Sequence, residues 1–122
     1  MDAFVPHRVL VVDDNRDIAN SVAALLRLLG HTVLPTYDGA TAVALAGNFK
    51  PEIAILDLSM PGMDGFEVAR QLRANPDIQP LKIVALTAQD QPATLERAQE
   101  AGIPVHLIKP TSAQELMNVL AF

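Results

Sequence analysis

The sequence has no cysteine and no tryptophan, and its aromatic residues are one tyrosine and four phenylalanines. The lack of cysteine excludes disulfides and thiolate metal sites, and it fits a reducing compartment. Half of the residues are hydrophobic. Because so few of these are aromatic, we expect aliphatic side chains and alanine to fill the core.

Positive charge is also scarce, since 9 lysine and arginine residues stand against 14 aspartate and glutamate residues, a net charge of −5. This balance argues against a nucleic-acid-binding surface and against binding to anionic membranes. No apolar run approaches the length of a membrane span, and the first ten residues lack the pattern of a signal peptide. We therefore expect a soluble, cytoplasmic, single domain over residues 1–122, in which residues 1–7 form an N-terminal extension.

Five short runs rich in aliphatic residues are predicted to be strands. Each is apolar on successive residues, which indicates a parallel sheet covered on both faces. Pro35 interrupts the second run and favours an edge strand, where its missing N–H costs no ladder hydrogen bond. The predicted strands are Arg8–Asp13, Thr32–Thr36, Ile53–Asp57, Lys82–Thr87 and Val105–Ile108.

Amphipathic segments with a helical period separate these runs. The first presents Ile18, Val22, Leu25, Leu26 and Leu29 on one face and is followed by Gly30. The others are predicted over Asp38–Ala46 (ending near Gly47), Asp64–Ala74 (Asp64 as N-cap), Pro92–Ala101 (ending at Gly102) and Ser112–Leu120. In the last, Ser112 and Glu115 are spaced as a capping box, and Ala113, Leu116, Met117 and Leu120 are expected to face inward. The alternation predicts an α/β fold, a doubly wound, flavodoxin-like parallel sheet of five strands in the order 2-1-3-4-5 with five helices.

Four of the predicted strands end on polar residues, namely Asp13-Asp14, Asp57, Thr87 and Lys109-Pro110. The carboxyl ends of parallel strands share one edge of the sheet, where open α/β folds bind their ligands. Three carboxylates, one hydroxyl and one ammonium group are therefore expected to form one site.

Bare carboxylates in such a cluster repel one another, which raises at least one pKa. A divalent cation offsets the repulsion, and all-oxygen ligands select Mg²⁺ or Mn²⁺ over Zn²⁺. Lys109 supplies a compact charge that suits a phosphoryl oxygen. A metal, an ammonium and a hydroxyl around a carboxylate indicate an aspartate that accepts a phosphoryl group.

Over essentially its whole length the chain resembles the receiver domain of two-component response regulators, which has the chemotaxis-type fold. The motifs that carry the resemblance stand in order along the chain and are specific as a set. They are Val11-Val12-Asp13-Asp14-Asn15, Ile55-Leu56-Asp57-Leu58-Ser59-Met60-Pro61-Gly62-Met63-Asp64-Gly65, Ala85-Leu86-Thr87-Ala88, Ala101-Gly102 and Lys109-Pro110.

The resemblance implies that Asp57 is the phosphoacceptor and that a histidine kinase or a histidine phosphotransfer protein is the donor. It also implies that Asp13, Asp14 and Asp57 hold Mg²⁺ (or Mn²⁺), with Asp14 as a direct ligand and Asp13 acting partly through water. The backbone carbonyl of Ser59 would complete the metal shell.

The same resemblance assigns contacts with the phosphoryl oxygens to Thr87, Ala88 and Lys109, and a cis peptide bond to Lys109–Pro110. Thr87 would move toward the phosphoryl group, and His106 would turn inward in response. The surface of the fourth helix, fifth strand and fifth helix would thereby change for a downstream target or tethered domain.

Two departures from the family pattern stand out. The switch position usually carries tyrosine or phenylalanine but here carries His106, which also occurs in receivers of hybrid histidine kinases and favours that context. The positions that tune the lifetime of the acyl phosphate are Ser59 and Gln89. Because neither is a strong acid or base, we predict no unusual rate of hydrolysis.

The remaining titratable residues are given structural roles. His7 and His31 are expected to face solvent, and three dispersed histidines make no metal cluster. Asp17, Asp38 and Asp90 lie near helix starts and are expected to act as cap or dipole residues.

Three other functions stay open. A phosphatase of the haloacid dehalogenase type would require a second carboxylate two residues after the nucleophile, where this chain has Ser59. A flavin binder would require a hydroxyl- and glycine-rich loop after the first strand, where this chain has Asp13-Asp14-Asn15-Arg16-Asp17. A pseudo-receiver, an interaction module that is never phosphorylated, is the main alternative. The choice of kinase would depend on surface residues of the first helix, such as Arg16, Asn20 and Arg27.

Overall fold

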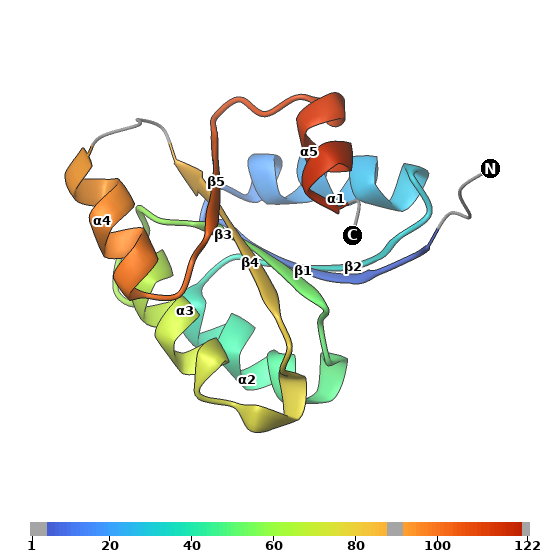
Figure 1. Cartoon of the computed structure of the whole chain (residues 1–122). Coiled ribbons are helices and arrows are strands. Elements are labelled where there is room, and N and C mark those ends of the chain that lie inside the picture. Colours follow the sequence, from blue (N-terminus) through green and yellow to red (C-terminus); the bar gives the residue numbers. More distant parts are fainter. Residues whose placement is uncertain (1–4, 88–91, 121–122) are drawn as a thin grey trace.

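The computed structural model describes residues 5–87 and 92–120 and shows one five-stranded sheet with helices on both faces (Figure 1). All strand pairs are parallel, in the order β2-β1-β3-β4-β5, which confirms the predicted fold. Pro35 lies in edge strand β2, as predicted. The strands are β1 (Arg8–Val12), β2 (Thr32–Thr36), β3 (Ile53–Asp57), β4 (Lys82–Thr87) and β5 (Val105–Ile108).

The helices form two layers (Figure 1). Helices α1 (Arg16–Leu28) and α5 (Ala113–Leu120) cover one face of the sheet. Helices α2 (Gly39–Phe49), α3 (Gly65–Arg73) and α4 (Pro92–Glu100) cover the other, with a short 3₁₀ turn (Pro76–Ile78) after α3. No helix among the described residues has the length and apolar character needed to span a bilayer.

Alternate residues of the central strands pack into the two layers of the core, one on each face of the sheet. Leu10 and Leu56 belong to the cluster under α2, α3 and α4, whereas Val11 and Ile55 belong to the cluster under α1 and α5. Each of these side chains is at most 1% exposed, so each contributes roughly 1.5–3 kcal/mol of hydrophobic stabilisation. The predicted covering of both faces is confirmed for the central strands. Edge strand β5 is less covered, and Ile108 is 37% exposed.

Side-chain caps fix the starts of the helices. Asn15 Oδ1 accepts the Ile18 N–H at the start of α1, and Asp64 Oδ1 accepts the Glu67 N–H at the start of α3. At α5 the predicted capping box is present, because Ser112 Oγ accepts the Glu115 N–H while Glu115 Oε1 accepts the Ser112 N–H. Each cap contributes about 1 kcal/mol.

Two sequence-based expectations about helices are wrong. Helix α2 does not end near Gly47 but continues to Phe49 and ends at Lys50, which has φ 55°. Glycine inside a helix costs only about 1 kcal/mol, and the residue that disfavours helix is the one before Pro51. In the eight-residue α5, Leu116 and Leu120 face inward but Ala113 and Met117 do not, because a helix this short buries only one narrow stripe.

The expectation that His7 and His31 face solvent is also wrong, since their exposed fractions are 5% and 9%. His7 directly precedes β1 and His31 directly precedes β2. Because Arg8 and Thr32 are partners in the parallel register, the two histidines are brought together and their rings stack. Dispersed positions in the sequence thus become a buried pair.

Candidate functional site

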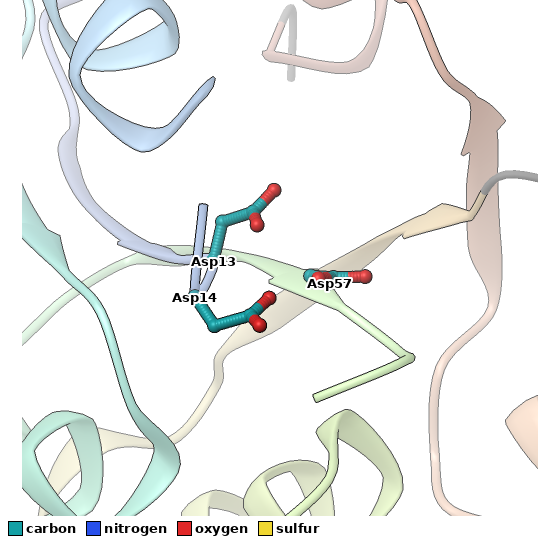
Figure 2. A group of neighbouring side chains, drawn as sticks. All are labelled: Asp13, Asp14 and Asp57. Atoms are coloured by element: carbon teal, nitrogen blue, oxygen red, sulfur yellow. The ribbon is translucent and has the colours of Figure 1, made fainter. Parts of the chain in front are cut away.

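Three aspartates meet at the carboxyl edge of the sheet. Asp13 and Asp14 follow β1, and Asp57 ends β3, the strand next to β1. One carboxylate oxygen of each lies within 4.8 Å of the others. Figure 2 shows the side chains of Asp13 and Asp14 extending from the end of β1 on the side where Asp57 lies. The predicted clustering of the three carboxylates is therefore present.

Lys109 joins this cluster from the end of β5. Its Nζ lies 2.9 Å from Asp13 Oδ2 and 3.3 Å from Asp57 Oδ1. The Lys109 N–H donates to the Thr87 carbonyl, which fixes the lysine backbone against β4. The Lys109–Pro110 peptide bond is cis, as predicted, and so is Gln79–Pro80, which the sequence did not indicate. One ammonium group thus bridges two of the three carboxylates.

Asp13 is held by its own strand end and by the start of α1. Its N–H donates to the Thr36 carbonyl at 3.1 Å, and its Oδ1 accepts the Asn15 N–H at 3.0 Å. Asn15 in turn caps α1. Thr36 donates its hydroxyl to the Val11 carbonyl at 2.9 Å, so β2 also supports this segment. Asp13 is fully buried, whereas Asp14 is exposed.

Asp57 is held by the loop that leads into α3. The Ser59 N–H donates to Asp57 Oδ1 at 3.1 Å. Gly65 begins α3, and a Cβ atom built on it would lie 2.3 Å from the Asp57 carbonyl oxygen. The structure shows that α3 starts in direct contact with the backbone of Asp57.

The charges of the cluster shift the pKa values of its members. Burial raises the pKa of Asp57 to about 6, and the charge of Asp13 adds to the rise, while the Ser59 N–H and Lys109 oppose it. Burial alone would lower the pKa of Lys109, but contact with Asp13 and the charges of Asp57 and Asp13 outweigh it and raise that pKa. The folded chain therefore disfavours an ionised Asp57, as expected for carboxylates without a cation.

Replacing Asp57 with Asn should stabilise the chain when divalent cations are absent. The folded pKa of about 6 exceeds the ordinary value of 3.8, so folding stability falls as pH rises between these values. At pH 7.5 we expect the free energy of unfolding of Asp57→Asn to exceed that of the wild type by about 3 kcal/mol, and by little at pH 4. Urea unfolding with a chelator measures this, with exposed Asp77→Asn as the control. An Asp57→Asn protein no more stable than the wild type at pH 7.5 would contradict the inference that an ionised Asp57 destabilises the folded chain.

The two predicted switch residues lie on neighbouring strands. Thr87 ends β4, is 7% exposed and pairs in register with Ile108. His106 is half-buried in β5 and pairs with Ala85. Both therefore lie on the strand pair that leads to Lys109. The predicted roles of Ala88 and Gln89 fall outside the described residues.

A cavity of about 490 Å³, which the sequence did not indicate, lies beside the cluster between α1 and the segment after β5. Ile18 and Val22 of α1 form one wall, and Lys109 and Pro110 form part of the other. The lysine thus separates an acidic cluster from a mainly apolar cavity next to the first helix.

Comparisons with known proteins agree with this geometry. The family of response regulator receiver domains matches residues 9–121. Response regulator MprA of Mycobacterium sp. (strain KMS) is 39% identical over 113 residues, which are 93% of this chain and 48% of MprA. The chain spans about half the length of the first curated relatives that it matches.

Two solved structures are similar over nearly the whole chain. The chemotaxis protein CheY4 of Vibrio cholerae has a TM-score of 0.90 and 29% identity, covering 95% of this chain and 97% of CheY4. The receiver domain of the sensor histidine kinase PA1611 from Pseudomonas aeruginosa has a TM-score of 0.85 and 31% identity, covering 95% of each chain. That receiver carries a magnesium ion coordinated in its active-site cleft.

Proposed function

The chain belongs to the response regulator receiver family, and we propose that its Asp57 accepts a phosphoryl group from a histidine kinase or histidine phosphotransfer protein in the cytoplasm. The observation that carries this proposal is the contact of one ammonium, Lys109 Nζ, with the carboxylates of both Asp13 and Asp57. Phosphoryl transfer requires chiefly positioning and neutralisation of charge, which this cluster supplies. The domain would receive a signal and would not turn over a metabolite.

Mg²⁺, or Mn²⁺ in its place, fits the acidic cluster as the cofactor. The donor set is all oxygen: the carboxylates of Asp13, Asp14 and Asp57 and the backbone carbonyl of Ser59. Asp13 Oδ2 is buried and lies 2.9 Å from its ion-pair partner Lys109 Nζ, but no described group donates a hydrogen bond of standard geometry to it. A bound cation would neutralise the carboxylates and the incoming phosphoryl oxygens.

The transfer step exchanges one bond to phosphorus for another. A carboxylate oxygen of Asp57 bonds to phosphorus while the phosphorus–nitrogen bond of the donor histidine breaks, and the electron pair of that bond stays on the imidazole nitrogen. Lys109, the Thr87 hydroxyl and the backbone of Ala88 would contact the phosphoryl oxygens. Because Asp57 is only 5% exposed, a donor can reach its carboxylate from a narrow range of directions.

The proposed output is a change of the surface formed by α4, β5 and α5. Thr87 would move toward the phosphoryl group, and His106, on the adjoining strand, would turn inward. This surface would then bind a downstream target or a tethered domain, with no nucleic acid bound by this domain. Histidine at the switch position and the likeness to the PA1611 receiver support the context of a hybrid kinase.

A second route links the site to the same surface. Arg97 of α4 lies with its guanidinium carbon 4.0 Å from the centre of the Phe66 ring and its Nη2 3.7 Å from Asp64 Oδ2. Asp64 and Phe66 flank Gly65, which contacts the backbone of Asp57. A shift of the loop after Asp57 would therefore reach α4 through α3.

Ser59 and Gln89 would set the lifetime of the acyl phosphate. Ser59 touches Asp57 through its backbone N–H, and neither side chain is a strong acid or base. We therefore propose an ordinary rate of hydrolysis for this family.

Incubation with acetyl phosphate, followed by intact-mass spectrometry, tests the function. We expect one phosphoryl adduct that requires Mg²⁺ and disappears with a chelator. No adduct with acetyl phosphate, or with a panel of phosphorylated histidine phosphotransfer proteins, would overturn the proposal and favour the pseudo-receiver.

Removing the charge of Lys109 should affect Mg²⁺ binding and phosphoryl acceptance in different ways. Lys109→Ala should bind Mg²⁺ as tightly as the wild type or more tightly, because a positive charge 2.9 Å from Asp13 is lost, and it should accept phosphoryl groups less well. Calorimetric titration with Mg²⁺ measures the first effect, and the adduct mass the second. Arg70→Gln, which removes an exposed positive charge, is the control. A clear loss of Mg²⁺ affinity in Lys109→Ala alone would contradict the proposed roles.

A further inference from the structure

A buried pair of histidines lies at the edge of the sheet opposite the aspartates. His7 precedes β1, His31 precedes β2 and Glu52 precedes β3, so all three lie at the amino ends of neighbouring strands. The two imidazole rings stack with their centres 5.6 Å apart and their planes 12° from parallel. The family match begins at residue 9, so His7 lies outside it.

The hydrogen bond between the two histidines fixes the charge state of one of them. The backbone N–H of His7 donates to Nδ1 of His31 at 3.0 Å. An imidazole nitrogen accepts a hydrogen bond only when it carries no proton. His31 must therefore be neutral, with its proton on Nε2, for this bond to exist.

The other groups around the pair act in opposite directions. His7 Nδ1 lies 3.2 Å from Glu52 Oε2, so the His7 ring faces a carboxylate. Glu52 Oε1 also accepts the Arg8 N–H, and the Arg8 side chain bonds the Phe49 carbonyl. Burial lowers the pKa of His31, the charge of His7 lowers it further, and Glu52 partly opposes both. Protonation of His31 on Nδ1 would therefore remove the hydrogen bond that it accepts from the His7 N–H.

We propose that His31 is a pH-sensitive latch for the segment that precedes β1. While His31 is neutral, the latch is the bond from the His7 N–H to His31 Nδ1, and residues 5–7 stay fixed at the starts of β1 and β2. When His31 Nδ1 takes a proton from solvent, it becomes a donor that faces another donor, the His7 N–H. The hydrogen bond between them therefore breaks. The backbone bond from the Thr32 N–H to the His7 carbonyl does not involve the His31 ring and is expected to persist.

Nuclear magnetic resonance of the full chain tests the latch directly. Nitrogen-15 chemical shifts of the imidazoles at pH 7.5 should show that His31 carries its proton on Nε2 and that its Nδ1 is unprotonated. Amide hydrogen exchange, corrected for its intrinsic pH dependence, should show the opening of the His7 amide increasing up to about tenfold between pH 7.5 and pH 5.5, because the freed imidazole has a pKa of about 6.5. A proton on Nδ1 at pH 7.5, or an opening constant independent of pH, would overturn the proposal.

The variant His31→Asn provides a matched control, because its amide oxygen can accept the same N–H and does not titrate. Stability from a neutral, buried His31 is present above pH 6.5 and is lost as pH falls below it. The wild type should therefore lose stability relative to His31→Asn between pH 7.5 and 5.5, while titrating groups that do not interact with His31 cancel in the difference. Parallel pH profiles of urea unfolding for the two proteins would contradict the latch, and so would a His7 amide that opens equally in both at pH 5.5.

Discussion

The Asp57→Ala protein should gain no phosphoryl mass after incubation with acetyl phosphate and Mg²⁺, whereas the wild type gains one adduct. The Ser59 N–H and Lys109 Nζ both contact the same carboxylate oxygen of Asp57, Oδ1. Its replacement removes the proposed nucleophile and one proposed oxygen ligand, so Mg²⁺ binding should weaken as well. Intact-mass spectrometry and Mg²⁺ titration measure the two losses.

The informative comparison is with the other carboxylates of the cluster. Asp13 is fully buried, and its oxygens are engaged by the Asn15 N–H and by Lys109, so it is a poor substitute nucleophile. Asp77→Ala, at an exposed position after α3, should keep the adduct. If Asp57→Ala still took up one phosphoryl group, peptide mapping would place it on another aspartate, and the assignment of Asp57 would be wrong.

Much of the fold could be predicted because the strands are nearly uninterrupted aliphatic runs. β3 and β4 have the predicted bounds, and β1 ends one residue earlier, at Val12. Strands that are apolar on both faces must be covered on both faces of the sheet. The helices between them therefore have few alternative positions. Pro35 then identified the edge strand from the missing backbone donor alone.

The details that depend on several side chains at once could not be predicted. The sequence placed Asp13, Asp57 and Lys109 at one edge of the sheet, but not the bridging of both carboxylates by one ammonium. The burial of His7 and His31 required the register of β1 against β2, which no local pattern encodes. The same holds for the cavity beside α1, whose walls come from three separate elements.

The substitution Gly65→Ala is expected to damage both stability and the site. A Cβ atom at this position would lie 2.3 Å from the Asp57 carbonyl oxygen and 2.8 Å from the Leu58 Cα, and neither backbone atom can move without moving Asp57, the proposed phosphoacceptor. Helix α3 must therefore shift away from β3. Forced contacts of this kind cost about 3 kcal/mol of folding free energy. Because the Asp57 backbone shifts with the loop, Mg²⁺ affinity and phosphoryl uptake should each fall by about tenfold or more, since a misplacement of about 1 Å has effects of this size.

Gly47→Ala is the control, because it makes the same chemical change where there is room for it. Among the described residues, a Cβ on Gly47 would meet only the Asn75 side chain, at 3.8 Å, and Gly47 lies inside α2. Alanine is the better helix former there, so this variant should be more stable than wild type by up to about 1 kcal/mol, with phosphoryl uptake unchanged. If the close contact with Asp57 governs Gly65, urea unfolding should therefore show stability changes of opposite sign in the two variants, and the phosphoryl adduct should decrease only in Gly65→Ala. Equal stability and equal uptake in both would show that α3 can begin farther from Asp57 without consequence, and the coupling of α3 to the phosphoacceptor would be lost with it.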